Sequence, residues 1–442
     1  MKLILAFAVA LFIGALAVLA ALSATPVISL EPPVTAVGSS TPVKVEVTGP
    51  YGIRRFTALL EQNGKQYRVF ERRQPARRLS FMRLHEDPHT FDFEAGKQQA
   101  PALVAGKASL IVQAQSNDFL GRTVSATYDV NVELKPPRLV VDEDQHYINQ
   151  GGSELVTFTV SGDWSEAGVK VGPHTFPSYP LPGKPKNERF SLFAFSWDLP
   201  VDTVPRVYAR NAAGTEVTAP FSYKVFPKPP RKRDLDLTDA FLDKVVNQID
   251  PTGSGDLLTR FLHINRELRK QNNQTLANLA QKTENRMLWN GPFVQLANSE
   301  VEAHFADVRT YIYKGKKVDE EAHLGFDLAA TQHVPVLAAN DGRVVWASDL
   351  GIYGNCIVLD HGYGLQSIYG HLSKIEVKVG DFVKKGQEMG RSGSTGLAGG
   401  DHLHFSMQVN GVQVTPVEWF DAHWIHDRIL SKLAPQSVLS KP

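Results

Sequence analysis

Four histidines and one aspartate in the last third of the chain have residue types and spacings that suit a metal site. Imidazole nitrogens and carboxylate oxygens are the ligands that Zn²⁺ takes where no thiolate is offered. His323, Asp327 and one histidine of the pair His402 and His404 would supply three protein ligands and leave a fourth position for water, as in catalytic rather than structural sites. The candidates lie in His323-Leu324-Gly325-Phe326-Asp327, Tyr369-Gly370-His371-Leu372-Ser373 and Asp401-His402-Leu403-His404.

The H-x-H pair predicts two imidazoles on one side of a strand. Side chains alternate between the two faces of a strand, so His402 and His404 would point the same way and Leu403 would point away. If His404 binds the metal, His402 stands beside the water at the metal, and together with His371 it could move protons during hydrolysis. Each histidine on its own is more simply interpreted as an ordinary surface or core residue. The five residues together favour a site.

The segment from about Asn298 to Phe420 resembles the lysostaphin-type zinc endopeptidases, also called the LytM family. The resemblance covers a little over a quarter of the chain and is specific in its motifs. These are H-L-G-F-D-L-A at 323–329, P-V-L-A-A-N-D-G at 335–342, L-D-H-G-Y-G at 359–364, I-Y-G-H-L-S at 368–373, V-K-V-G-D-F-V-K-K-G-Q at 377–387 and the run from Gly390 to Phe405.

The resemblance implies a chemistry and a substrate. By position, His323, Asp327 and His404 match the family's zinc ligands, and His371 and His402 match its two non-ligand catalytic histidines. The implied activity is Zn²⁺-dependent hydrolysis of peptide cross-links in bacterial peptidoglycan. The alternative is a non-catalytic wall-binding adaptor that activates another hydrolase, because some members of the family have lost metal ligands. The ligand set is intact in this chain.

One stretch departs from the family pattern. The family often has Phe-Gly-x-Arg leading into the domain, whereas this chain has Ala303-His304-Phe305-Ala306-Asp307-Val308-Arg309, which lacks the glycine and is a residue longer before the arginine. We expect this difference to affect the wall at the entry of the groove and not the metal site.

An internal repeat precedes this domain. Val112-Gln113-Ala114-Gln115-Ser116-Asn117 resembles Val207-Tyr208-Ala209-Arg210-Asn211, and each unit ends in Lys-Pro-Pro-Arg. The period of 95 residues is the size of an immunoglobulin-type sandwich. The repeat predicts two Ig-like β-sandwiches, roughly at 27–136 and 138–227, which resemble bacterial spacer modules.

The region 236–290 has a helical period. Phe241, Val245 and Ile249 recur at intervals of four, and further apolar residues follow at three and four. The stretch 227–233, with its prolines and charges, is typical of a stiff linker. We expect the apolar stripe of the helical segment to be buried against the C-terminal domain or the second sandwich. A gate over the cleft is an alternative role.

The N-terminus carries an export signal. After Lys2, the residues Leu3 to Leu22 are uncharged and mostly apolar, which is long enough for a helix to cross a hydrocarbon core of about 30 Å. We expect residues 1–24 to be an uncleaved signal anchor in the inner membrane. The small residues Ser23 and Ala24 leave open a cleaved signal peptide and a secreted protein.

Composition narrows the possible partners. The net charge of +1 gives no general case for binding nucleic acid. Cys356 is the only cysteine, so the chain forms no intramolecular disulfide, and its strand-like surroundings predict a small buried residue. Residues 54–83 contain nine arginines or lysines against two acids. They suit an exposed strand face, and contact with anionic lipid or an anionic wall polymer is the alternative.

A second sequence motif that could bind zinc is not expected to do so, because a proline interrupts the helix that it requires. His85-Glu86-Asp87-Pro88-His89 satisfies H-E-x-x-H, which binds zinc only when one continuous helix places both histidines on one face. Pro88 inside a helix would cost about 3 kcal/mol or more. We therefore expect a loop here, followed by a strand.

The sequence thus predicts a mainly β multidomain protein of the cell envelope. Its expected parts are a signal anchor, two Ig-like β-sandwiches, a short helical segment and an antiparallel β peptidase domain at 295–422. The peptidase domain would face the periplasm or another extracytoplasmic space, with a peptidoglycan peptide as its substrate.

Overall fold

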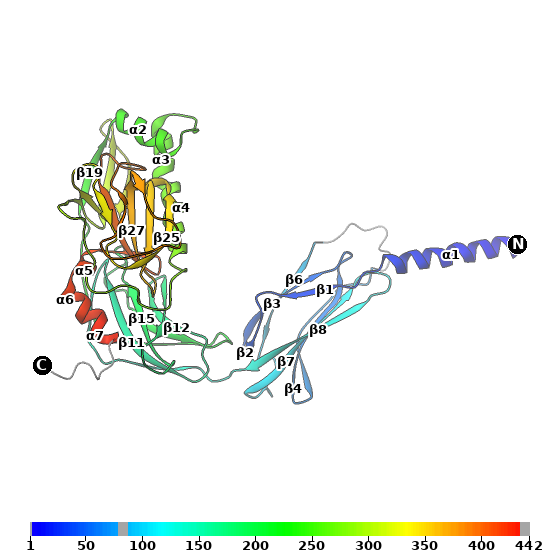
Figure 1. Cartoon of the computed structure of the whole chain (residues 1–442). Coiled ribbons are helices and arrows are strands. Elements are labelled where there is room, and N and C mark those ends of the chain that lie inside the picture. The colour runs from blue at the N-terminus through cyan, green and yellow to red at the C-terminus, as the bar shows by residue number, and fades with distance from the viewer. Residues whose placement is uncertain (1, 78–86, 434–442) are drawn as a thin grey trace. The chain divides into compact units, whose positions relative to one another are not determined.

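The computed structural model describes residues 2–77 and 87–433 (Figure 1). Contacts divide the described chain into two compact units. The first contains the residues up to 138 and the segments 161–166 and 209–217, and the second contains the remainder. Strands make up most of the regular structure in both units, so the predicted mainly β fold class with an N-terminal apolar helix is confirmed.

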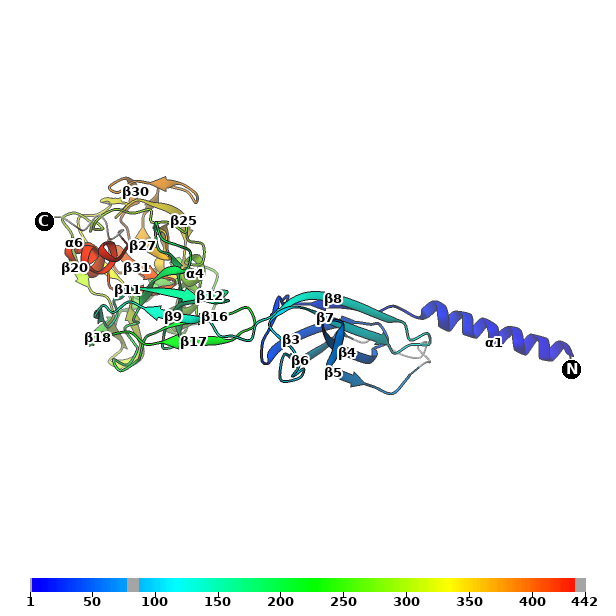
Figure 2. The same ribbon diagram turned by 90° about the horizontal axis from the view of Figure 1, so that it is seen from below.

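Helix α1 (Lys2–Leu22) is apolar from its second residue onward. The stretch Leu3–Leu22 is long and apolar enough to cross a membrane, although a signal sequence meets the same criteria. Figures 1 and 2 both show α1 extending away from the strands of the first unit. Two contacts fasten the end of the helix to that unit. The Ser23 hydroxyl accepts from the Leu120 N–H at 3.1 Å, and the Ala24 N–H donates to Asp118 at 2.9 Å.

Two mainly antiparallel sheets form the rest of the first unit. Their strand orders are β2-β8-β7-β4-β5 and β1-β3-β6. Alternate residues of β3 are buried, and Val43 and Val45 join Phe56 and Phe91 in one apolar core. The immunoglobulin type stays a prediction, as do the limits 27–136. The strands are β1 (Val27–Leu30), β2 (Ala36–Val37), β3 (Thr41–Thr48), β4 (Ile53–Gln62), β5 (Lys65–Arg73), β6 (His89–Ala95), β7 (Gly106–Ser116) and β8 (Thr123–Val132).

The basic stretch 54–83 runs along β4 and β5, and its residues 78–83 lie outside the described residues. Arg73, Arg68 and Arg55 all pair with Glu71 at 2.6–2.7 Å, and they hold the pKa of this carboxyl at about 2. Such pairing suits a solvent-exposed strand face. The described part of the stretch offers nothing further that favours contact with lipid.

The rejected H-E-x-x-H motif falls partly outside the described residues, because His85 and Glu86 are not among them. Its second histidine, His89, begins β6, in which buried and exposed residues alternate. The expected strand after the motif is therefore confirmed, and His89 lies on no helix.

The second group of strands forms two four-stranded sheets and one pair. The sheet orders are β14-β15-β11-β9 and β13-β12-β16-β17, and β10 pairs with β18 in parallel. The assignment of this region, 138–227, to the immunoglobulin type stays a prediction. The strands are β9 (Arg138–Val141), β10 (His146–Asn149), β11 (Ser153–Ser161), β12 (Glu166–Val171), β13 (His174–Pro177), β14 (Tyr179–Pro180), β15 (Glu188–Ala194), β16 (Arg206–Arg210), β17 (Glu216–Ala219) and β18 (Tyr223–Phe226).

The predicted linker at 227–233 is shorter than expected. Strand β19 (Lys232–Leu237) pairs in parallel with β21 (Asp307–Tyr313), so the linker's last two residues already belong to a sheet. The charges of Lys232 and Arg233 favoured a solvated linker, whereas the partner strand lies far along the chain and is not visible in local sequence. β19 therefore becomes part of the C-terminal domain.

The helices after β19 pack on the C-terminal domain. Leu242, Val245, Phe261 and Leu276 share one apolar core with strand residues such as Val358, and Figure 1 shows α2–α4 beside the sheet that contains β25 and β27. The amphipathic stripe is thus buried on the domain that carries the candidate metal residues. The helices are α2 (Asp239–Ile249), α3 (Leu257–His263), the π-helix Ile264–Leu268 and α4 (Arg269–Leu279).

A large antiparallel sheet forms the centre of the C-terminal domain. Its order is β20-β23-β31-β27-β26-β25-β29, with β32 added beside β31. Cys356 is fully buried in β26, as predicted, and burial raises the pKa of its thiol. The strands are β20 (Glu300–Ala303), β21, β22 (Lys316–His323), β23 (Phe326–Ala329), β24 (Pro335–Leu337), β25 (Gly342–Asp349), β26 (Asn355–Asp360), β27 (Leu365–Leu372), β28 (Lys374–Ile375), β29 (Phe382–Val383), β30 (Glu388–Arg391), β31 (Leu403–Val409) and β32 (Val412–Val414).

The C-terminal helices fasten this domain to the second group of strands. They are α5 (Val417–Phe420), α6 (Ala422–Ile425), the π-helix His426–Leu430 and α7 (Ser431–Leu433). Lys432 Nζ donates to Glu154 Oε1 at 3.0 Å and to the Leu155 carbonyl at 2.7 Å. Glu418 accepts from Asn149 Nδ2 at 2.8 Å and from the Ser153 N–H at 2.7 Å. Burial raises the pKa of Glu418 to about 7, against the pull of these two donors.

The buried Glu418 predicts a pH-dependent stability. A carboxyl whose folded pKa is raised from 4.5 to about 7 takes up a proton that the unfolded chain has released. The contribution of Glu418 to the free energy of unfolding is fully present below pH 4.5. It is lost as the pH rises towards 7, and the total loss is about 3 kcal/mol. Glu418→Gln cannot ionise. Relative to the wild type, this variant should therefore gain free energy of unfolding across that window, measured by denaturant titration at each pH. Parallel stability curves would contradict the assignment.

Candidate metal centre

Three side chains from neighbouring strands bring their ligand atoms together. His323 ends β22, and Asp327 of β23 lies directly opposite His404 of β31 in the antiparallel pairing. His323 Nε2 lies 2.9 Å from Asp327 Oδ1 and 3.0 Å from His404 Nδ1, and His404 Nδ1 lies 3.1 Å from Asp327 Oδ1. A tetrahedral ion with bonds of about 2.0–2.1 Å separates its ligand atoms by about 3.3 Å. The triangle therefore has nearly the size that such an ion requires.

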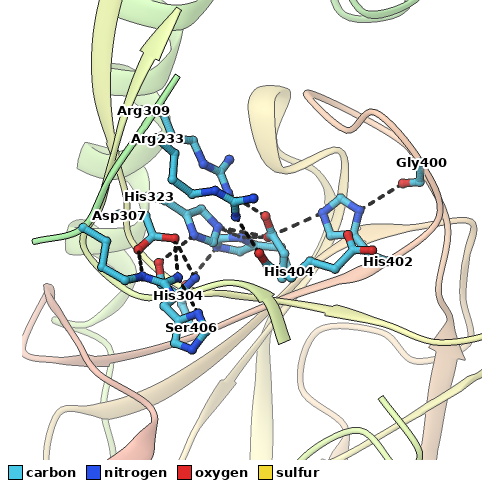
Figure 3. A network of polar contacts seen from close by, with 12 residues as sticks. Arg233, His304, Asp307, Arg309, His323, Gly400, His402, His404 and Ser406 are labelled. Carbon is cyan, nitrogen blue, oxygen red and sulfur yellow. Dashed lines mark hydrogen bonds and ion pairs between the residues drawn. The ribbon is translucent and has the colours of Figure 1, made fainter. Parts of the chain in front are cut away.

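Hydrogen bonds on the far side of each ring set the nitrogen that faces the triangle. His323 Nδ1–H donates to the His304 carbonyl at 3.1 Å, and His404 Nε2–H donates to Ser406 Oγ at 2.9 Å. Ser406 Oγ in turn donates to the Leu324 carbonyl at 2.6 Å. The lone pairs of His323 Nε2 and His404 Nδ1 thus converge (Figure 3). Converging lone pairs repel unless a cation lies between them, so the donor set fits a metal ion.

The charge states also suit metal binding. Burial lowers the pKa of His404 to about 4 and also lowers that of His323, so both rings are neutral near pH 7, as ligands must be. Burial alone would raise the pKa of Asp327. The contacts that the carboxylate makes with His323, His402 and His404 outweigh this effect and hold its pKa well below the ordinary value.

A chain of polar contacts supports the triangle from β19 and β21. Arg309 Nη2 donates to Asp327 Oδ2 at 2.6 Å, which leaves Oδ1 for the triangle. Arg231 donates two hydrogen bonds of 2.8 Å to the two carboxylate oxygens of the buried Asp307. Asp307 accepts from the His304 N–H at 3.0 Å, and the His304 carbonyl holds His323 (Figure 3). The expectation that the departure at 303–309 affects only the entry of the groove is therefore wrong, because His304, Asp307 and Arg309 of this stretch hold His323 and Asp327.

The remaining two histidines stand beside the triangle. His371 Nδ1 donates to the Thr395 carbonyl at 2.8 Å, and His402 Nδ1 donates to the Gly400 carbonyl at 2.9 Å, so each ring keeps Nε2 for other work. The two ring centroids are 4.8 Å apart, and His402 Nε2 lies 3.4 Å from Asp327 Oδ1. His371 has a φ of 63°, which is costly for a residue with a side chain and is typical of functional positions.

A cleft of about 620 Å³ opens over these residues. Arg233 and Leu235 of β19 and Phe241 of α2 form one wall, and the loop before His402 forms another. Lys244 of α2 donates to the Ala398 and Gly399 carbonyls at 3.3 and 3.2 Å, so the helix is bonded to that loop. The helical segment is therefore a fixed part of the cleft lining in this structure.

All five predicted site residues come together, and their separate roles stay predictions. Among the residues that hold the candidate ligands, Ser406 could have been predicted from the sequence, because it lies two positions after His404 and so on the same face of the strand. Arg231 and Asp307 could not have been predicted, because their pairing joins segments that are far apart in the sequence. The role of the His304 carbonyl could not have been predicted either, because a main-chain group leaves no trace in the residue type.

Comparisons with known proteins agree with this geometry. Residues 321–416 match the model of peptidase family M23. A protein of Haemophilus influenzae, named an uncharacterized metalloprotease, is 43% identical over 96 residues, which cover 22% of this chain and 20% of that protein. The DD-carboxypeptidase/endopeptidase Mpg of Neisseria meningitidis serogroup B is 40% identical over 95 residues, covering 22% of each chain. The peptidoglycan DD-endopeptidase ShyA of Vibrio cholerae is 41% identical over 96 residues, again covering 22% of each.

The chain thus spans about a fifth of the length of the curated relatives that it matches. The matched region contains all five candidate residues, His323, Asp327, His371, His402 and His404. The three relatives are named a metalloprotease, a DD-carboxypeptidase/endopeptidase and a peptidoglycan DD-endopeptidase, and the first of these names agrees with a metal-binding donor set. The resemblance noted in the sequence is confirmed: the C-terminal part of this chain is a domain of peptidase family M23, the LytM and lysostaphin family.

Proposed function

We propose that this protein is a zinc-dependent endopeptidase that hydrolyses peptide cross-links of bacterial peptidoglycan. The observation that carries the proposal is the triangle of His323 Nε2, Asp327 Oδ1 and His404 Nδ1, with edges of 2.9–3.1 Å and its lone pairs turned inward. The substrate class is supported by the names of the relatives, two of which are peptidoglycan or DD-endopeptidases.

His323, Asp327 and His404 would hold the metal. Two neutral imidazoles and one carboxylate are a donor set that Zn²⁺ accepts while it keeps a position for water. When bound, Zn²⁺ supplies Lewis acidity to the scissile carbonyl and to a water molecule beside it. Arg309 holds the second oxygen of Asp327, and Ser406 holds the far nitrogen of His404, so both ligands are fixed in orientation.

His371 and His402 would handle the protons. The Nε2 atom of one ring takes a proton from the attacking water as its oxygen bonds to the scissile carbonyl carbon. The proton is then given to the amide nitrogen as the C–N bond breaks, so the products are a free carboxylate and a free amine. The second ring, when it also carries a proton on Nε2 and is therefore an imidazolium, can donate that Nε2–H to the oxyanion of the tetrahedral intermediate. The Thr395 and Gly400 carbonyls fix both rings for this work.

The cell envelope is the place that this substrate implies. The apolar helix α1 fits a membrane anchor, and two contacts support its retention. Ser23 accepts a hydrogen bond from the Leu120 N–H, and the Ala24 N–H donates to Asp118. Cleavage after Ala24 would remove both contacts. We propose that α1 holds the chain in the inner membrane with its C-terminal domain outside the cytoplasm.

Substitutions in the proposed metal site should reduce Zn²⁺ binding to different extents. Asp327→Ala and His404→Ala should abolish stoichiometric Zn²⁺ binding, because each removes one of three ligands. Ser406→Ala should keep the ion but weaken its affinity by about 10- to 100-fold, because His404 loses the group that orients it. His423→Ala is the control, since this side chain is 86% exposed. Elemental analysis and chelator competition measure the series. Full occupancy in both ligand variants would show that the ion, if any, is held elsewhere.

The proton-transfer roles are tested on purified sacculi by the release of free amines, with and without a chelator. His402→Ala and His371→Asn should retain metal and lose activity by about 10²- to 10⁴-fold. Asparagine is chosen because the φ of 63° at His371 suits it better than alanine. Near wild-type turnover in either variant would remove that histidine from the mechanism. A wild-type protein that binds metal, releases no amines and stimulates another hydrolase would instead establish the adaptor alternative.

The anchor predicts where the mature chain is found. The full-length protein should fractionate with the inner membrane and resist extraction by salt, because Leu3–Leu22 is long enough to span the bilayer. N-terminal sequencing of the mature protein supplies the second readout. A new terminus at or near Thr25, together with a soluble protein, would show a cleaved signal peptide.

A further inference from the structure

The wall of the cleft built by β19 lies outside the region that matches the family, and it places an arginine next to the metal residues. β19 and β21 are parallel, and Arg233 is paired in register with Arg309. Side chains in register on neighbouring strands project from the same face of a sheet. Both arginines line the cleft with His323 and Asp327, and Figure 3 shows them extending towards the cluster.

The two arginines differ in how their charge is balanced. The Arg309 guanidinium is neutralised by Asp327 Oδ2 at 2.6 Å. Arg233 Nη1 donates to the main-chain carbonyl of Glu302 at 2.6 Å, and no carboxylate within the described chain forms an ion pair with it. The carbonyl fixes the position of the Arg233 side chain without balancing its charge. An exposed, positioned and unbalanced guanidinium is thus left at the edge of the cleft.

The rest of the lining does not offer the same arrangement. Arg269 also lines the cleft, but it belongs to α4 and not to the strand beside Arg309, and its Nε and Nη2 atoms both donate to oxygens of Asn265. The next residues of β19 and β21 on the same face, Leu235 and its partner Tyr311, are apolar. Acidic side chains, those of Asp236, Glu302 and Asp401, also line the cleft, and Arg233 is the cation beside Arg309 and the candidate metal ligands that forms no ion pair with a carboxylate in the described chain.

We propose that Arg233 determines specificity by binding a free carboxylate that the peptide substrate carries next to the bond that is cut. A guanidinium binds a carboxylate through two parallel N–H donors, which gives direction as well as charge. The bond to Glu302 leaves the other donors of Arg233 available. This inference rests on the proposed endopeptidase function and deepens it by naming a feature of the substrate.

The test uses two synthetic cross-linked peptides that differ in one group. One has a free carboxylate beside the scissile bond, and in the other that group is a primary amide. The zinc-loaded wild-type protein should cleave the carboxylate form about 10- to 100-fold more efficiently in kcat/KM. Arg233→Gln should lose that preference, mostly through KM, and should cleave the amide form as the wild type does. Unchanged cleavage of the amide form and unchanged metal content show that the variant is folded.

Lys232→Gln is the matched control. Lys232 is the neighbour of Arg233 on β19, projects from the opposite face of the strand and carries the same charge. It should retain the wild-type preference. Equal cleavage of the two peptides by the wild type, or a preference that persists in Arg233→Gln or disappears equally in Lys232→Gln, would overturn the inference while the endopeptidase function stands. A wild-type protein that cleaves neither peptide nor sacculi would remove the proposed function itself.

Discussion

The site depends on one buried carboxylate, that of Asp327. An anion removed from water is costly unless donors and cations compensate it. Here Arg309 satisfies one oxygen at 2.6 Å, and three imidazoles, those of His323, His404 and His402, approach the other within 2.9–3.4 Å. Two of these rings are already committed as donors on their far sides, so they face the carboxylate as acceptors. Only a bound cation or an extra proton resolves that arrangement, which is why the geometry favours a metal.

The candidate metal ligands could be predicted from the sequence, because the members of each pair are only a few residues apart. His402 and His404 are two positions apart, and His323 and Asp327 lie on either side of the short turn between β22 and β23. The residues that hold these candidate ligands in place could not be predicted from local spacing. The prolines and charges around Arg231 indicated a linker, but its bond to Asp307 depends on a parallel strand that lies more than seventy residues away. Periodicity predicted the helices at 236–290, whereas their final position depended on which apolar surface was available.

Buried contacts at the C-terminus join the C-terminal domain to the part of the second group of strands that belongs to the same compact unit. Lys432 is nine-tenths buried and bonds Glu154, which is fully buried. Breaking such a pair leaves an uncompensated charge, so separation of the two parts would be costly. Glu418 adds a second buried polar contact nearby, between α5 and the start of β11. The second group of strands and the C-terminal domain are therefore held together by buried polar contacts.

The candidate catalytic residues and the cleft wall come from different stretches of the chain. All five candidate residues for chemistry lie within 321–416, the region shared with relatives, whereas Arg233, Leu235 and Phe241 precede it. A side chain of β19 that faces the cleft can change without moving Asp327, because Arg309 and the strand pairing of β23 with β31 hold that carboxylate. Arg231 is different, since its bond to Asp307 leads through His304 to His323. One short segment thus contributes a support of the candidate metal site and, in our proposal, the side chain that selects the substrate, and of the two only the second can vary without disturbing the site.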